Sequence, residues 1–133
     1  MVLEIMNEEP IRVDADDLKR LVLETLEDMK AQNVKVLDVR QLTDVTDVMI
    51  IASGTSNRHV KGMAAQVRDR LRESARIRPI GVEGESEGDW VLVDLGDVVV
   101  HLMQPETREY YDLERLWNRE VEELVKLNRE QPE

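Results

Sequence analysis

An uninterrupted apolar run in the first half of the chain most constrains the fold. Residues 48–52 read Val-Met-Ile-Ile-Ala, with no polar side chain between Asp47 and Ser53. A strand with one solvated face alternates apolar and polar residues, whereas a continuous run is typical of a strand that is covered on both faces. Such burial requires further chain on both sides of a sheet. The run therefore predicts a β-sheet packed by helices.

Three segments have the three- and four-residue apolar spacing of amphipathic helices. The first follows Asp14 or Asp16, either of which can be its N-cap, and is expected to end near Asn33. The second is expected over residues 57–78, since the position before Pro79 disfavours helix. The third begins at Pro105. The apolar faces comprise Leu18, Leu21, Val22, Thr25, Leu26 and Met29; then Val60, Met63, Ala64, Val67, Leu71 and Ala75; then Tyr110, Leu113, Leu116, Trp117, Val121 and Leu124.

Strands are expected between these helices, at residues 34–39, 47–52, 79–82, 90–94 and 97–103. The last two are expected to form a hairpin that bends at Leu95 and Gly96. The order of elements predicts an α/β fold with a small mixed β-sheet packed by helices. A length of 133 residues fits one domain. We expect a leader over residues 1–13, a single α/β domain over 14–128 and a frayed tail over 129–133.

Composition limits the chemistry and the partners. There is no cysteine, and His59 and His101 are far apart in sequence, so no zinc-ligand spacing is present and no cofactor is expected. The formal net charge of −11 repels phosphate backbones, so the partner of the acidic face is expected to be a basic protein. The N-terminal residues lack a basic start and a long apolar stretch, which favours a cytoplasmic protein without a membrane segment.

An acidic segment with one aromatic residue is the candidate binding site. Residues 81–97 contain six carboxylates, no Lys or Arg, and Trp90. An aromatic anchor beside uncompensated negative charge is typical of a surface that binds a basic partner. The candidate partner-binding residues are Trp90, Asp89, Asp94, Asp97, Glu83, Glu85, Tyr110 and Tyr111. Two alternatives remain open: Trp90 is a core residue, and the acidic segment is ordinary solvated surface.

Strand alternation places Trp90 and Asp94 on one face of their strand and Val91 and Val93 on the other, without showing which face the helices cover. His101 lies between apolar neighbours, which favours a packed, hydrogen-bonded histidine over a contact residue.

The second helix has the opposite charge. Its basic residues are Arg58, Lys61, Arg68, Arg70, Arg72, Arg76 and Arg78, against Asp69 and Glu73. A solvated face is the favoured interpretation. Contact with RNA and pairing with the acidic region of a second copy also fit these charges.

An enzymatic alternative rests on two short patterns. The Gly54-Thr55-Ser56 sequence before a helix can cradle a phosphate, and Glu83 and Glu85 imitate the paired carboxylates that hold magnesium. Both patterns are weak, because the two glutamates lie in a glycine-rich loop and no third carboxylate or phosphate-binding lysine has a fitting spacing.

Two sequence blocks strongly resemble the ribosomal silencing factor family, also called the Iojap-like family. They are Thr46-Asp47-Val48-Met49-Ile50-Ile51-Ala52-Ser53-Gly54-Thr55-Ser56-Asn57-Arg58-His59-Val60 and the stretch from Gly81 to Trp117, which ends in Glu106-Thr107-Arg108-Glu109-Tyr110-Tyr111-Asp112-Leu113-Glu114-Arg115-Leu116-Trp117. The likeness covers roughly residues 14–117.

The resemblance implies a nucleotidyltransferase-related fold without catalysis. It also implies binding to the large ribosomal subunit through its protein number fourteen, which blocks joining of the small subunit and lowers translation. Trp90 would be the anchor, with Asp89, Asp94, Asp97, Glu83 and Glu85 facing Lys and Arg of that protein. The alternatives are a nucleotidyltransferase-like enzyme and a generic acidic scaffold. Peripheral contact with ribosomal RNA and a homodimer are both compatible with the charges and with an uncovered sheet edge.

Overall fold

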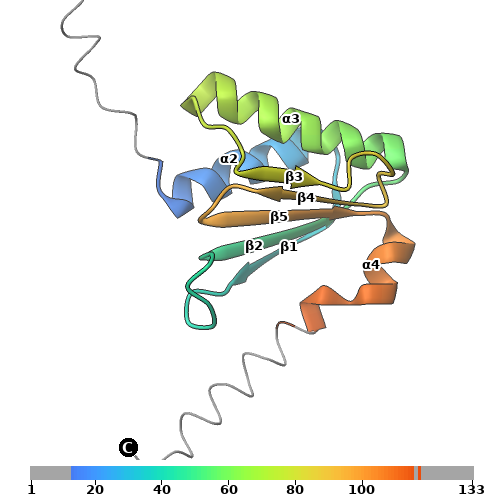
Figure 1. Ribbon diagram of the computed structural model, residues 1–133. Coiled ribbons are helices and arrows are strands. Elements are labelled where there is room, and N and C mark those ends of the chain that lie inside the picture. The colour runs from blue at the N-terminus through green and yellow to red at the C-terminus, as the bar shows by residue number, and fades with distance from the viewer. Residues whose placement is uncertain (1–12, 116, 118–133) are drawn as a thin grey trace, which may run out of the picture.

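The computed structural model describes residues 13–115 and residue 117 of the chain. Its elements, in chain order, are α2 (Ala15–Asp28), β1 (Gln32–Asp38), β2 (Val48–Ser53), α3 (Asn57–Ala75), β3 (Gly81–Glu83), β4 (Trp90–Asp94), β5 (Val98–Met103) and α4 (Pro105–Tyr111) (Figure 1). The expected leader up to residue 12, residues 118–128 of the expected domain and the tail over 129–133 lie outside the described residues, as do Leu116, Val121 and Leu124 of the third helix.

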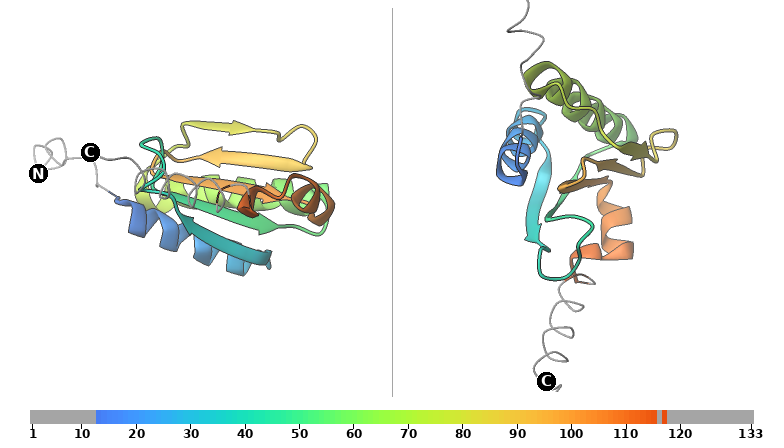
Figure 2. Two further views of the ribbon diagram at one scale, coloured as in Figure 1. Left: turned by 90° about the horizontal axis from the view of Figure 1, so that it is seen from below. Right: turned by 60° about the vertical axis from the view of Figure 1, so that its left-hand side comes forward.

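The strands form one five-stranded sheet in the order β1-β2-β5-β4-β3. Strands β2 and β5 are parallel, and the other neighbouring pairs are antiparallel. Helices α2 and α3 cover one face, and α4 lies on the other side of the sheet (Figures 1 and 2). The prediction of an α/β fold with a small mixed sheet packed by helices is confirmed. The nucleotidyltransferase-like topology stays a prediction.

The apolar run over residues 48–52 lies in strand β2, and all six residues of this strand are buried. Ile50 and Ala52 face α2 and α3 in the larger apolar core, whereas Met49 and Ile51 belong to a smaller cluster on the opposite face. Each fully buried Ile or Leu contributes about 1.5–3 kcal/mol by removal from water. The two-sided burial expected for this strand is confirmed.

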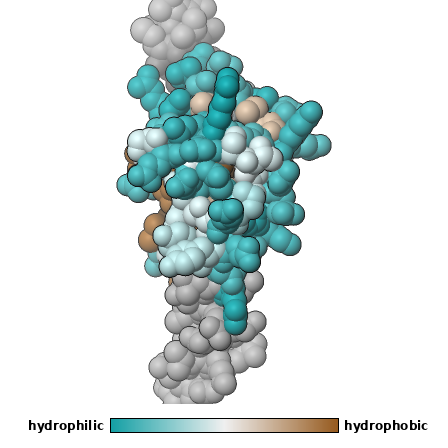
Figure 3. All heavy atoms as spheres, turned by 90° about the vertical axis from the view of Figure 1, so that its right-hand side faces the viewer, coloured by the Kyte–Doolittle hydropathy of each residue, from teal (hydrophilic) through white to brown (hydrophobic). Residues whose placement is uncertain are grey.

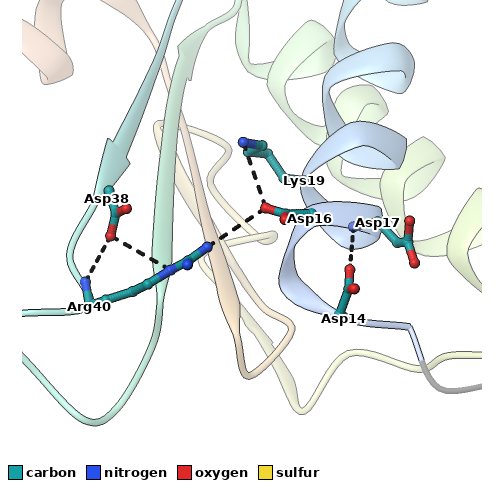
Figure 4. Close-up of polar contacts among 6 residues, drawn as sticks. All are labelled: Asp14, Asp16, Asp17, Lys19, Asp38 and Arg40. Atoms are coloured by element: carbon teal, nitrogen blue, oxygen red, sulfur yellow. Dashed lines mark hydrogen bonds and ion pairs between the residues drawn. The ribbon is translucent and has the colours of Figure 1, made fainter.

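Helix α2 begins where the sequence allows it and ends earlier than expected. The carboxylate of Asp14 caps it by accepting a hydrogen bond from the backbone N–H of Asp17 at 2.9 Å (Figure 4). The helix ends at Asp28 rather than near Asn33, because Lys30 adopts the left-handed conformation with φ of 60°. Arg40 then ties the helix start to the sheet, since its guanidinium forms ion pairs with Asp16 and Asp38 (Figure 4).

The other two helices also end early. Helix α3 ends at Ala75 rather than Arg78, because Arg76 reverses the chain with φ of 55°. A single third helix with an apolar side from Tyr110 to Leu124 was expected, and this prediction is wrong because Asp112 adopts φ of 49° and interrupts the helix after Tyr111. Helical residues resume at 113–115. This break at Asp112 turns the chain just after the residue that packs against Trp90.

Candidate docking surface

Trp90 lies on the sheet face that α2 and α3 leave open. Val91 and Val93 point into the larger core beneath those helices, so Trp90 and Leu92 point to the opposite side. The structure thus settles which face of β4 the two long helices cover. The Trp90 side chain is half-buried and packs against the cluster that contains Met103. Part of the indole is therefore anchored in apolar surroundings while part remains accessible.

Two side chains hold the indole. Its Nε1–H donates a hydrogen bond to Nδ1 of His101 at 3.0 Å, and the Tyr111 ring lies 4.9 Å away between centroids at an interplanar angle of 49°. Burial lowers the pKa of His101 from 6.5 to about 4, so the imidazole is neutral near pH 7 and its Nδ1 can accept this bond. The interpretation of His101 as a packed, hydrogen-bonded histidine is confirmed.

Arg108 positions α4 over this face of the sheet. Its guanidinium donates to the Ser53 hydroxyl at 2.9 Å and to the Glu114 carboxylate at 2.6 Å, and the residue is buried. These bonds fix the short helix that carries Tyr111. Nothing in the sequence distinguishes Arg108 from the other arginines, so sequence reasoning missed it. Tyr110, by contrast, is 81% exposed and touches Tyr111 edge-on.

Carboxylates line the hollows on both sides of Trp90. One hollow has a volume of about 310 Å³, and its lining residues are Gly84, Ser86, Glu87, Asp89, Trp90, Thr107 and Tyr111. A second, of about 270 Å³, is lined by Glu83, Gly84, Trp90 and Leu92. Figure 3 shows this end of the molecule, where hydrophilic side chains predominate. Trp90 therefore sits between acidic hollows, and Glu87 joins the residues singled out from the sequence.

The remaining candidate acids lie elsewhere. Asp94 is four residues along β4 from Trp90, a distance of about 13 Å, and its carboxylate accepts a hydrogen bond from the Gly96 N–H at 2.9 Å. Asp97 is exposed in the turn between β4 and β5. Glu85 forms an ion pair with Arg68 of α3 at 3.3 Å. The structure gathers Asp89, Glu83, Tyr111 and Trp90 and separates Asp94 and Asp97 from them.

The Gly54-Thr55-Ser56 pattern behind the enzymatic alternative has other hydrogen-bond partners here. The Gly54 N–H donates to the Met103 carbonyl at 2.9 Å, and the Thr55 N–H donates to Nδ1 of His59 at 2.9 Å. Two of the three backbone donors proposed for a phosphate are thus already bonded. Within residues 13–115 and 117, no three His, Asp or Glu side chains are grouped to hold a metal ion. No helix in this part of the chain is both long and apolar enough to cross a bilayer.

Comparison with known proteins decides the family. The family model described as "Ribosomal silencing factor during starvation" matches residues 12–133. The chain belongs to the ribosomal silencing factor family. This confirms the resemblance found in the sequence, and the match extends beyond the two blocks that carried it.

Relatives in bacteria and in animals agree with this assignment. A ribosomal silencing factor from Chromobacterium violaceum is 46% identical over 105 residues, which cover 79% of this chain and 85% of that protein. A crystal structure of a protein from the same organism superposes with a TM-score of 0.76 at 45% identity, covering 79% of this chain and 87% of the other. A mouse relative, named "Mitochondrial assembly of ribosomal large subunit protein 1", is 37% identical over 99 residues, or 73% of this chain and 43% of that protein.

Proposed function

We propose that this ribosomal silencing factor docks on the large ribosomal subunit, through the subunit's protein number fourteen, with the surface around Trp90. The docked protein blocks joining of the small subunit and thereby represses translation. Membership of the family and the name of the mouse relative support a ribosomal partner. The observation that carries the proposal is the half-buried indole between two hollows lined by carboxylates.

This surface has the chemistry of a docking site for a basic protein. A tryptophan buries roughly 200 Å² on full enclosure, and Trp90 still has part of its side chain to bury. Its contacts with His101 and Tyr111 hold the ring in place, so little conformational freedom is lost on binding. The exposed carboxylate of Asp89 can attract Lys and Arg of the partner and orient the encounter.

The proposed mechanism is steric and uses no covalent chemistry. A protein bound on the face of the large subunit that meets the small one occupies space that the second subunit needs. Repression then depends on affinity and bulk alone, so its strength should follow occupancy of the large subunit.

Co-sedimentation with purified large subunits tests the proposal. The Trp90→Ala variant should bind at least about 2 kcal/mol more weakly, or roughly 30-fold, because it loses the central anchor. The matched control is Val45→Ala, which truncates a side chain that is 81% exposed, in the loop between β1 and β2. Adding purified small subunits then measures joining, which the native protein should inhibit and Trp90→Ala should not. Normal binding by a folded Trp90→Ala protein would contradict the proposal.

A further inference from the structure

A cavity of about 410 Å³ lies on the helix side of β3, between α3 and the segment that follows it. Its lining residues are Arg68, Arg72, Ile77, Arg78, Pro79, Gly81 and Val82. Val82 pairs with Val93, whose side chain is buried beneath the helices, whereas Glu83 pairs with Leu92 on the Trp90 side. Figure 1 shows α3 running above β3 on this side of the sheet. The cavity is therefore separated from the proposed docking surface by the sheet itself.

The cavity is a basic region of an acidic protein. Residues 68–78 contain five arginines, at 68, 70, 72, 76 and 78, against Asp69 and Glu73, which gives +3 in a chain of net −11. A helix C-terminus favours cations in its last turn, which accounts for Arg72 and for Arg76 at the cap. Arg68 lies earlier in α3 and Arg78 lies beyond its end, so helix electrostatics do not explain their position at the same cavity.

The guanidinium groups at the cavity are available to a ligand. Arg68 pairs with Glu85 at 3.3 Å and with Asp69 at 3.9 Å, and Arg72 pairs with Asp69 at 3.5 Å. All four side chains are at least 38% exposed. Exposed pairs of this kind contribute little to stability, so a stronger anion can replace them. Within the part of the chain that the structure describes, Arg78 forms no ion pair.

The floor of the cavity is apolar. Ile77, Pro79 and Val82 contribute it, beside the three arginines. Guanidinium groups bind phosphate oxygens through paired hydrogen bonds, and an apolar floor suits the face of a planar ring. The volume lies within the range of small-molecule sites, about 300–1,000 Å³.

We infer that this cavity binds a nucleotide-type ligand, with its phosphates on Arg68, Arg72 and Arg78 and its base against the apolar floor. The site is additional to the docking surface and does not depend on it. A free nucleotide and a nucleotide unit of RNA present the same chemistry, and the experiment below distinguishes them.

Isothermal titration of the full chain at fixed ionic strength tests this inference, with pyrophosphate, GTP and a mixed-sequence RNA hexamer as the probes. The cavity variant is Arg72→Gln with Arg78→Gln, which leaves the Arg68–Glu85 pair intact. The matched control is Arg20→Gln with Arg58→Gln, which removes the same charge from two exposed positions that do not line the cavity. We expect one saturable site for GTP or for the hexamer, and an affinity at least tenfold lower in the cavity variant and changed less than twofold in the control.

A hexamer that binds more than tenfold tighter than GTP identifies RNA as the source, and any smaller ratio identifies a free nucleotide. Absence of saturable binding for both GTP and the hexamer overturns the inference, even if pyrophosphate binds. The inference is also overturned if the loss of affinity in the cavity variant exceeds the loss in the control by less than fivefold. Binding would then follow net charge rather than this site. None of these results depends on whether Trp90 docks on the large subunit.

Discussion

Trp90 and His101 are joined by a hydrogen bond between neighbouring strands, in which the indole Nε1–H donates to the imidazole Nδ1 at 3.0 Å. The bond links a partly accessible residue of the proposed docking surface to a buried residue of β5. It requires a neutral imidazole, because a protonated Nδ1 cannot accept a hydrogen bond. Protonation of His101 should therefore disturb both the stability of the fold and the position of the indole.

Stability should fall on acidification because of His101. Its pKa is lowered from 6.5 to about 4 by burial, so the unfolded chain binds a proton in this interval that the folded chain does not. The contribution of His101 to the free energy of unfolding is complete above pH 6.5 and is lost progressively as the pH falls towards 4. The shift corresponds to about 3 kcal/mol.

Urea unfolding of the native protein and of His101→Gln at several pH values between 7 and 4.5 measures this effect. The stability of the variant should depend less steeply on pH. Both proteins have the same carboxylates, so the contributions of these groups cancel when the two free energies of unfolding are subtracted. Parallel pH profiles for the two proteins would show that His101 does not carry the effect.

Gly84 should be the most sensitive glycine near the docking surface. It adopts φ of +87°, and a Cβ there would overlap the backbone carbonyl oxygen of Trp90. We expect Gly84→Ala to cost about 2 kcal/mol, from the left-handed backbone and the displaced strand start, and to weaken large-subunit binding. Gly81→Ala is the control, because its added Cβ meets no atom within 4 Å, and it should change stability by less than about 0.5 kcal/mol. Urea unfolding and co-sedimentation measure the two effects, and equal results for the two variants would contradict the prediction.

Arg108 should contribute more stability than other arginines. Its replacement by Met leaves the Glu114 carboxylate and the Ser53 hydroxyl without their partner, at an expected cost of about 2–4 kcal/mol. Arg115→Met removes an exposed arginine from the same segment and should have little effect.

Adding Glu114→Gln to Arg108→Met should recover part of the loss, because the uncompensated charge is then removed. Denaturant unfolding of these variants tests the prediction. A cost for Arg108→Met no greater than that for Arg115→Met would show that α4 is held by other contacts.

Large-subunit binding should weaken with added salt, since the carboxylates around Trp90 are exposed and the Debye length falls from about 10 Å at 0.1 M to 3 Å at 1 M. Glu87→Gln with Asp89→Asn should make this dependence shallower. The paired control is Asp94→Asn with Asp97→Asn, which removes the same charge from the far end of the hairpin. It should reduce the salt dependence of binding by a smaller amount. Association rates measured over a salt series test this, and a larger effect of the control pair would relocate the contact surface.

The sequence predicted those features whose cause is local. Strand β2 was recovered because a continuous apolar run needs no knowledge of its partners, and Gly96 does adopt the positive φ, 88°, expected at the hairpin bend. The helix ends were missed because the chain reverses at Lys30, Arg76 and Asp112. Lysine and arginine carry no signal for a left-handed backbone, and a single aspartate within an apolar helical pattern is only a weak one.

The contacts of the candidate site depend on register and on long-range packing. Leu92 pairs with His101, which brings Trp90 within reach of the imidazole. This strand register cannot be predicted from the residue types alone. Arg108 bonds to Ser53 across 55 positions of the chain. Likewise, the six carboxylates are contiguous in sequence, but the fold separates Asp94 and Asp97 from Trp90 and pairs Glu85 with Arg68. Residue types indicated the kind of surface, and the fold determines which of them share it.

The position of β5 has a consequence for biosynthesis. Among the described strands it is the last to leave the ribosome, yet it occupies the middle of the sheet, between β2 and β4. Until Val98–Met103 has emerged, the nascent chain has two half-sheets with open edges and no continuous core between them. A protein proposed to act on ribosomes can therefore reach its working shape only once Val98–Met103 has itself been translated.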